Sequence, residues 1–352
     1  MKDMTVQTAE QEWKVPDQTD PLLSGLMPLT GASFPPGRCV DYIGTLKDGA
    51  EKEIARAEYH YFRGEPETAL QLSAKYLASP DMMIWLSASL LYVYSCISLG
   101  QTGQAGQVLS QLRNIGQKSG EDGSFPAKAA AFISGTAAVL LHLPFPDSAL
   151  PICEMMDELP QGLRAFALYV FAHQMYLQGN FDKSVGIVEA ALAMGGGCYP
   201  IPAVYLHLAA VMSYVANKRK EQAEQHLLAA WRIALPDGLI EGFGEHHGLM
   251  GGMLEAVIKP AWPVEFRKII GITYRFSDGW RRIHNPETGN HVTDDLTTTE
   301  FSVAMLAARG WTNQEIGEHM KISINTVKAH VAQAMRKLNV ENRKRLKEYL
   351  LP

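Results

Sequence analysis

The side chains best suited to chemistry lie near the end of this chain, on a helix expected over residues 323–338. Asn325 and Lys328 in its first turns can exchange hydrogen bonds with the edges of nucleic-acid bases. Between His319 and Val340 there are four Lys or Arg residues and no Asp or Glu. A helix that approaches phosphate groups should lack carboxylates in this way, so the pattern predicts a surface for double-stranded DNA.

Short local patterns are expected to fix the helices around this surface. Thr297 with Glu300, and Thr312 with Glu315, have the Thr-x-x-Glu spacing of a capping box. In such a box the two side chains bind backbone N–H groups that the first helical turn leaves unpaired. Ser323 is the expected cap of the third helix. Each cap therefore marks the start of one helix.

The second and third helices are expected to form a helix-turn-helix. Only Lys321 and Ile322 separate the second helix from the cap of the third, and so short a connection forces a sharp crossing. Gly317 is the small residue expected where the two helices touch. The apolar residues expected to anchor them are Ile316, Met320, Ile322, Val327 and Val331. The first helix should end at Gly310, and a fourth should start near Asn342.

Residues Leu296–Leu350 closely resemble the helix-turn-helix domain of the LuxR (GerE) family. The residues that carry the resemblance are Leu296, Thr297, Glu300, Gly310, Asn313, Glu315, Ile316, Ser323, Thr326, Val327, Lys328, His330, Lys337, Leu338 and Arg343. The resemblance implies that the chain binds double-stranded DNA and that its fourth helix contacts a second copy in a homodimer. The side chains expected at that dimer contact are Leu346, Tyr349 and Leu350. The sequence departs from the family at Gly317, where Ala is usual, and at Ala332, where some members have a base-reading Lys.

The resemblance also implies roles for individual residues. It assigns Lys328 and Ala329 to the DNA groove. It assigns phosphate-side or supporting roles to Thr312, Asn313, Thr326, Lys337 and Arg343. With the polar residues on the outer side of the third helix, the expected DNA-binding set is Thr312, Asn313, Ser323, Asn325, Thr326, Lys328, Ala329, His330, Gln333, Arg336, Lys337 and Arg343. Two alternatives stay open: His330 packs within the domain, and Arg336 is merely solvated.

Charge is divided along the chain in a way that favours this assignment. The formal net charge is −5. Residues 296–352 carry nine Lys or Arg against five Asp or Glu, which leaves 23 basic and 32 acidic residues in 1–295. A basic end can approach phosphate, whereas an acidic body is repelled by it.

Residues 46–283 are expected to form an all-α body, since apolar residues recur there at helical spacing. A weak repeat combines an aromatic residue, a turn, an acidic residue and a second helix. Its turns are expected at Gly64, Gly100, Pro144, Gly179 and Asn217. This period predicts a helical-hairpin array. The unit resembles the tetratricopeptide repeat, although an irregular all-α array fits nearly as well.

The remaining segments complete the predicted organisation. Residues 1–45 are rich in Pro, Gly and Thr and predict an irregular N-terminal arm. Residues 262–283 are expected to close the helical array. Residues 284–295 predict a linker, and residues 296–352 the DNA-binding domain.

Several function classes lack support in the sequence. There is no GxxxxGK[ST] phosphate loop and no catalytic spacing of Ser, His, Asp or Cys, so no enzyme and no cofactor is expected. Adjacent side chains on a helix diverge, so Glu245, His246 and His247 predict no metal site. The four cysteines are far apart, and no apolar run reaches the ~18–20 residues that span a bilayer. A cytoplasmic protein without membrane contact is expected.

The sequence therefore predicts a transcription regulator whose helical body receives a small-molecule or protein signal. The chain is similar to the last two parts of the maltose-regulon activator family, without that family's ATPase. A helical-repeat adaptor, whose basic end docks a protein partner, is the alternative. An enzyme built on the helical body is a third possibility.

Overall fold

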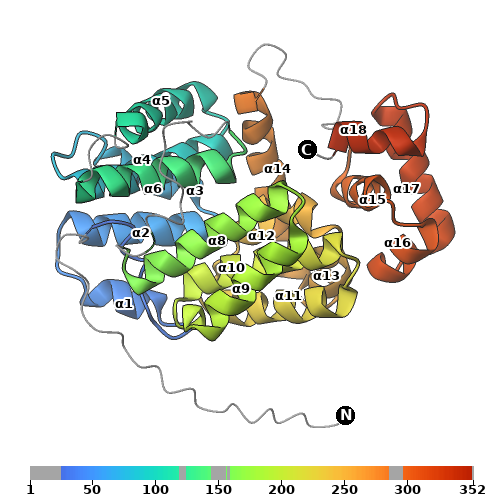
Figure 1. Ribbon diagram of the computed structural model, residues 1–352, viewed down its shortest axis with the longest axis horizontal. Helices are drawn as coiled ribbons and strands as arrows, with labels where there is room; N and C mark the ends of the chain where they lie inside the picture. Colours follow the sequence, from blue (N-terminus) through green and yellow to red (C-terminus); the bar gives the residue numbers. More distant parts are fainter. Residues whose placement is uncertain (1–24, 119–123, 144–155, 157–158, 285–295, 351–352) are drawn as a thin grey trace, which may run out of the picture.

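The computed structural model describes residues 25–118, 124–143, 156, 159–284 and 296–350. Every regular element in these ranges is a helix, which confirms the all-α expectation. Figure 1 shows a large helical body, coloured blue to orange, and a small red domain at one side of it. The described chain is therefore a helical body followed by a small helical domain.

Helical hairpins make up most of the body. Their helices are α2 (Ala50–Phe62), α3 (Pro66–Ala74), α4 (Met82–Ser98), α5 (Thr102–Lys118), α6 (Phe125–Leu140), α8 (Gln161–Leu177), α9 (Phe181–Ala193), α10 (Pro200–Ala216) and α11 (Lys220–Ala234). Consecutive helices pack on each other in the pairs α2–α3, α4–α5, α8–α9 and α10–α11. Neighbouring pairs stack on each other, as the contacts between α3 and α4 and between α8 and α10 show. Stacking buries the apolar face that a single hairpin leaves exposed.

The described turns of these hairpins occur where the repeat predicts them. Gly64, Gly100 and Gly179 have φ of +80°, +70° and +75°, a region that strains any residue with a Cβ atom. At the turn predicted around Asn217, the residue with positive φ is the next one, Lys218. The turn predicted at Pro144 lies outside the described residues. Closer likeness to the tetratricopeptide repeat stays a prediction.

The irregular course predicted for the N-terminal arm is present over residues 25–38, but residues 39–45 form a helix. Residues 25–38 run through the body without regular structure and lead into α1 (Cys39–Thr45). The part of the prediction that concerns residues 1–24 lies outside the described residues. The segment is buried rather than loosely attached.

Side chains of the body satisfy the backbone of this buried segment. Leu29 and Thr30 are completely buried, and their N–H groups donate to the Glu58 carboxylate at 2.7 and 3.0 Å. The N–H of Met27 donates to Ser87 Oγ at 2.8 Å. Irregular backbone can be buried only when such partners exist. They are distant in sequence, so composition and periodicity give no sign of them.

The last elements of the body close the array. They are α12 (Glu241–Glu245), the 3-10 turn η5 (His247–Met250), the π-helical turn η6 (Leu254–Ile258), α13 (Lys259–Ala261) and α14 (Pro263–His284). The long α14 packs closely on α4, since a Cβ atom at Gly279 would lie 1.8 Å from the carbonyl oxygen of Ile97. This confirms the predicted closing helix. Beyond its first residue, the linker predicted for 284–295 lies outside the described residues.

None of the described helices combines the length and apolarity that crossing a bilayer requires.

Candidate nucleic-acid interface

The red domain contains the four predicted helices. They are α15 (Thr298–Ala308), α16 (Asn313–Met320), α17 (Ile324–Lys337) and α18 (Leu346–Leu350), the last preceded by the 3-10 turn η8 (Arg343–Arg345). Gly310 follows α15 with φ of +80°, as the sequence predicts for a helix end.

Both predicted capping boxes are present. Thr297 Oγ1 accepts from the N–H of Glu300 at 3.2 Å, and Glu300 Oε2 accepts from the N–H of Thr297 at 2.8 Å. The second box, Thr312 with Glu315, has the corresponding distances of 3.2 and 2.6 Å. Ser323 Oγ accepts from a backbone N–H of α17, so the third cap is confirmed as well. Short-range side-chain chemistry therefore sets where α15, α16 and α17 begin.

The turn between α16 and α17 needs a residue without a side chain at one point. Lys321 has φ of +57°, and the N–H of Ile322 donates back to the carbonyl oxygen of Gly317 at 3.0 Å. A Cβ atom at Gly317 would lie 2.9 Å from the carbonyl oxygen of Ile322, closer than side chains normally approach. Gly317 is therefore the point of close contact that the sequence predicts.

The predicted apolar anchors form the core of this unit. Ile322 is half-buried, and the buried anchors are Ile316, Met320, Val327 and Val331. Ala334 and Leu338, one and two turns further along the chain, are buried together with these anchors. Burial of one face of α17 fixes which face remains for a ligand.

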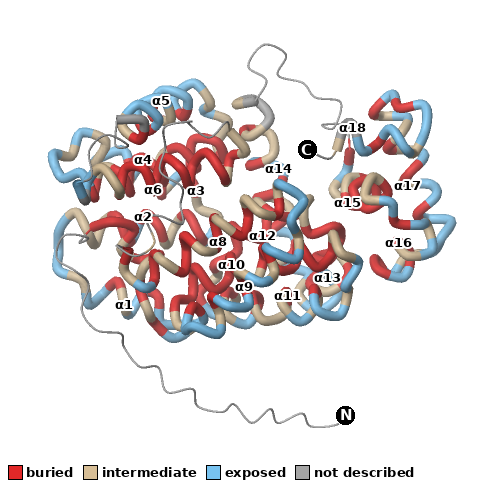
Figure 2. Tube along the Cα trace, in the orientation of Figure 1, coloured by how far each residue is buried: buried red, intermediate tan, exposed pale blue. Residues whose placement is uncertain are grey.

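The other face of α17 is open to solvent. In Figure 1, α17 lies at the outer edge of the domain with α15 on the side towards the body, and Figure 2 shows much of its outer side in pale blue. Among the predicted DNA-binding residues, those exposed are Thr312, Ser323, Asn325, Thr326, Lys328, Ala329 and Arg336. His330 and Gln333 are half-buried, and Gln333 Oε1 accepts from Arg336 at 2.9 Å. An exposed helical face without carboxylates can enter the major groove of DNA.

Sequence reasoning missed some residues of this surface. Ile324, in the first turn of α17, is 45% exposed, and an apolar side chain there suits the methyl group of thymine. It continues the helical spacing of Val327 and Val331, which suggests a core residue. Lys344 and Lys347 are also exposed, beside the predicted Arg343. The run of basic residues from 343 to 345 is the signal that would have indicated them.

Three predicted DNA contacts instead hold the domain together. Arg343 donates to Asn313 Oδ1 and to the carbonyl oxygen of Trp311. Lys337 Nζ lies 2.8 Å from Glu300 Oε2. Asn313, Lys337 and Arg343 thus fit the supporting role that the resemblance implies. Because each side chain is already bound within the domain, none of them fits a free phosphate contact. Each of these bonds joins parts of the chain 30 or more residues apart, which the sequence could not pair.

Replacing Lys337 by Met should therefore act on stability. It leaves the Glu300 carboxylate, which is 7% exposed, without its cation. The expected cost is about 1 kcal/mol, or a fall of a few degrees in the midpoint of thermal unfolding. The matched control is Lys344→Met, since Lys344 is exposed. If Lys337→Met weakened DNA binding while leaving the unfolding midpoint unchanged, the side chain would belong to the phosphate contacts instead.

The predicted dimer contact needs one correction. Leu346 is completely buried within its own domain, so its side chain offers no surface to a second chain. Leu350 is half-buried and packs against the same core. The side chain of Tyr349 lies outside the described residues.

The small domain packs on the helical body through α15 and α16. His319 Nε2 donates to the carbonyl oxygen of Gly251 at 2.9 Å; burial lowers the pKa of His319 to about 4, so its ring is neutral near pH 7. Lys321 Nζ donates to the carbonyl oxygen of Ala256 at 2.9 Å. Arg309 donates to the carbonyl oxygen of Leu249 at 3.3 Å. All three acceptors lie between residues 249 and 256 of the body.

Two lysines of the turn between α10 and α11 complete this contact. Lys218 Nζ lies 3.0 Å from Glu315 Oε1, and Lys220 Nζ donates to the carbonyl oxygen of Glu318 at 3.1 Å. The pKa of Glu315 is lowered to about 2, because it accepts from the N–H of Thr312 and then from Lys218. The Glu315 carboxylate is thus bound to the body and to its own cap, and the Glu318 carboxylate accepts from Gln314 of the same helix at 3.0 Å.

Glu245, His246 and His247 have separate partners. Glu245 accepts from the hydroxyl groups of Tyr61 and Tyr205, and His246 Nε2 lies 2.9 Å from the hydroxyl group of Tyr169. His247 binds Glu255 at 2.9 Å. Within the described residues, no three His, Cys, Asp or Glu side chains converge as a metal site would require.

The comparisons with known proteins concern the small domain. Residues 294–350 match the family model "Bacterial regulatory proteins, luxR family". The chain is 44% identical over 50 residues to the transcriptional regulatory protein LiaR of Bacillus subtilis, a match that covers 14% of this chain and 24% of LiaR. It is 39% identical over 56 residues to the oxygen regulatory protein NreC of Staphylococcus carnosus, covering 16% and 26%. It is 44% identical over 48 residues to the response regulator VraR of Staphylococcus aureus, covering 14% and 23%.

The extent of these matches is limited. The chain spans about a quarter of the length of the curated relatives it matches. No solved structure matches the chain. The family model does not extend into the helical body.

Proposed function

We propose, from the premise that residues 294–350 are a helix-turn-helix domain of the LuxR family, that this chain is a sequence-specific DNA-binding transcription regulator. The observation that carries the proposal is the open face of α17, which has polar and basic residues and no carboxylate. The body covers α15 and α16 and leaves that face free (Figure 1). A DNA duplex can therefore reach the helix in the docked arrangement.

The proposal is tested by the dependence of DNA binding on salt. Arg336, Lys344 and Lys347 are exposed, and if each neutralises one phosphate, the logarithm of the affinity should fall linearly with the logarithm of the salt concentration. Three such contacts predict a loss of about 40-fold between about 50 and 200 mM salt. The measurement is a gel-shift titration with fragments recovered from genomic DNA by the full chain.

The controls separate the two functions that the basic domain could serve. Recovery of particular loci supports a regulator. Equal recovery of all fragments, or binding to an acidic protein with none to DNA, would support the adaptor alternative. We also infer that two chains bind paired half-sites, since half-site spacing reflects the symmetry of dimeric helix-turn-helix proteins. The mass of the DNA complex in solution measures that stoichiometry.

We further propose that the helical body receives the signal, as a small molecule or a protein. Support comes from one segment of the chain, which runs from the interior of the body to the surface that contacts the DNA-binding domain. Glu245 is bound deep in the body, and the next residues, from 246 to 258, accept the hydrogen bonds of α15 and α16. A change around Glu245 would therefore act directly on the surface that holds the domain.

A further inference from the structure

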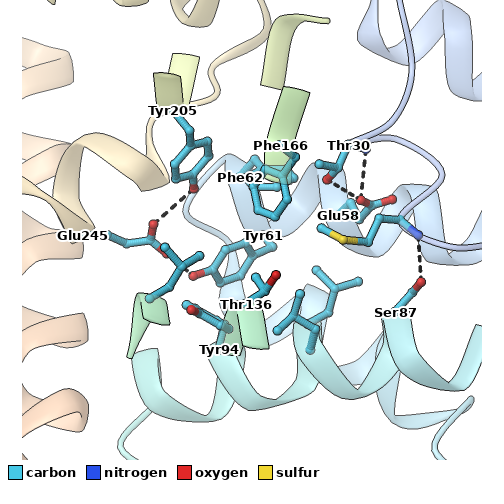
Figure 3. A pocket seen from close by; sticks show the side chains of 14 residues that line it. Thr30, Glu58, Tyr61, Phe62, Ser87, Tyr94, Thr136, Phe166, Tyr205 and Glu245 are labelled. Carbon is cyan, nitrogen blue, oxygen red and sulfur yellow. Dashed lines mark hydrogen bonds between the residues drawn. The ribbon is translucent and has the colours of Figure 1, made fainter. Parts of the chain in front are cut away.

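An internal cavity of about 50 Å³ lies in the helical body. Its lining comes from α2, α4, α6, α8, α10 and α12 and from the buried N-terminal segment (Figure 3). On the scale in which ~150 Å³ holds the six carbon atoms of benzene, this space holds about two non-hydrogen atoms. The cavity is thus large enough for a molecule of the size of methylamine.

Two carboxylates and no basic side chain line the cavity among the described residues. Glu58 accepts three hydrogen bonds, from the backbone of Leu29 and from the backbone and hydroxyl group of Thr30. Glu245 accepts from the hydroxyl groups of Tyr61 and Tyr205 (Figure 3). Hydrogen bonds of this kind stabilise the charged form of a carboxylate. The lining is therefore set up for negative charge.

Burial works against that charge. It raises the pKa of Glu58 and of Glu245 to about 7, so neither carboxylate is fully ionised near neutral pH. His246, which contacts the ring of Tyr205, supplies no compensating charge, because burial lowers its pKa to about 4. A cation beside Glu245 would pair with its carboxylate and would favour the ionised form.

Aromatic rings form much of the remaining lining. Tyr61, Phe62, Phe166 and Tyr205 line the cavity, and neighbouring rings lie at centroid distances of 5.9 Å for Phe62–Tyr205 and 6.3 Å for Phe166–Tyr205. Aromatic rings attract organic cations through their π electrons and accommodate an apolar stem. An anion would find neither a positive charge nor a basic donor here.

Two hydroxyl groups of the lining have no hydrogen-bond partner among the residues that the structure describes. The Tyr94 and Thr136 side chains are buried, and neither Tyr94 Oη nor Thr136 Oγ1 makes a hydrogen bond. Buried polar groups without partners are rare because they lose their bonds to water. Both line the cavity (Figure 3), and burial, followed by the nearby Glu245 carboxylate, raises the pKa of Tyr94. Together with the Glu245 carboxylate, the two hydroxyl groups can accept hydrogen bonds from a ligand in the cavity.

We propose that this cavity binds a small organic amine in its protonated form. The ammonium group donates to the Glu245 carboxylate and to the hydroxyl groups of Tyr94 and Thr136. The apolar stem lies against Phe62 and Phe166. The proposal that the amine binds depends on the cavity alone, whereas the role of the amine as the signal rests on the proposed function.

The test compares three small probes of similar size on the full chain. They are methylamine, methanol and formate, which are cationic, neutral and anionic. The amine alone should raise the midpoint of thermal unfolding and release heat in calorimetry, with a Kd on the order of 10 mM for so small a ligand. An equal response to methanol would mean that the cavity selects by size and would overturn the proposal, as would no response to the amine.

A conservative variant identifies the site. Tyr94→Phe keeps the ring and removes a hydroxyl group that has no hydrogen-bond partner in the described part of the chain, so folding should be retained. It should weaken amine binding by about 5- to 10-fold, the size of one hydrogen bond. Tyr92→Phe makes the same change on the outer side of α4 and should leave the affinity unchanged. Equal affinities in both variants would contradict this site.

The outcomes also separate this proposal from the regulator function. Amine binding in a chain that binds no DNA would keep the cavity proposal and remove the signalling role. DNA binding in a chain that binds no amine would keep the regulator function and would remove the cavity proposal.

Discussion

Lys328→Ala is expected to weaken DNA binding by about 10- to 100-fold and to relax the base preference at one position of the site. Lys328 is exposed in the second turn of α17, whereas Val327 and Val331 are buried. A lysine at this place reaches base edges in the major groove, where it donates to guanine. Loss of that contact should affect the best site more than it affects random DNA.

The controls for Lys328 distinguish base contacts from general charge. Lys344→Ala removes an exposed charge near η8, so it should weaken all sequences alike and reduce the salt slope by about 1. Lys183→Ala removes an exposed charge from α9 of the body and should change nothing. Gel-shift titrations on a selected site and on random DNA measure all three. If Lys328→Ala lowered affinity equally for both DNAs, Lys328 would be a phosphate contact and another residue would read the bases.

The DNA-binding domain could be predicted from the sequence because its determinants are local. The capping boxes act over three residues, and the Gly317 contact spans a five-residue turn. The sequence could not supply the partners that are distant in the chain. Lys337 and Arg343 were expected in phosphate-side or supporting roles, and the partners that fit the supporting role lie on α15 and at the start of α16.

In the body, too, local features could be predicted and contacts between distant residues could not. Turn glycines and helical spacing predicted its hairpins, since both follow from backbone geometry. The buried course of residues 25–38 could not be predicted, because Glu58 and Ser87 satisfy its backbone from other helices. The cavity escaped prediction for a related reason. Tyr94, Thr136 and Glu245 come from three helices, and no spacing in the sequence brings them together.

Glycines of η5 and its C-terminal end let the body approach the DNA-binding domain closely. A Cβ atom at Gly248 would lie 2.3 Å from the ring of Phe301 in α15, and one at Gly252 would lie 3.0 Å from Met320 in α16. Gly251 is the most constrained, with φ of +55° and with side chains of both the body and the domain around it. Its carbonyl oxygen also accepts from His319. This turn is therefore the place where the docked arrangement can be broken.

Gly251→Val is expected to release the DNA-binding domain from the body. A Cβ atom at this position would lie 2.9 Å from Val215 of α10 and 3.0 Å from Leu306 of α15. A β-branched residue with positive φ adds backbone strain. Together, crowding and strain should cost about 2–4 kcal/mol, which separation of the domain relieves. The radius of gyration from X-ray scattering should rise, and an amine bound in the cavity should no longer alter DNA affinity.

Two further variants decide whether that result reports on docking. Gly186→Val makes the same substitution in α9, where a Cβ atom meets no other atom within 4 Å, and should leave the radius of gyration unchanged. Arg309→Ala acts from the domain side by removing the bonds to Leu249 and to the hydroxyl group of Tyr176 in α8, so it should produce the same expansion without a change in the sequence of the body. Expansion in Gly251→Val alone would indicate damage to α10 and not undocking. If neither variant expanded, the DNA-binding domain would be held by contacts other than this turn, and a signal would have to reach α17 by another route.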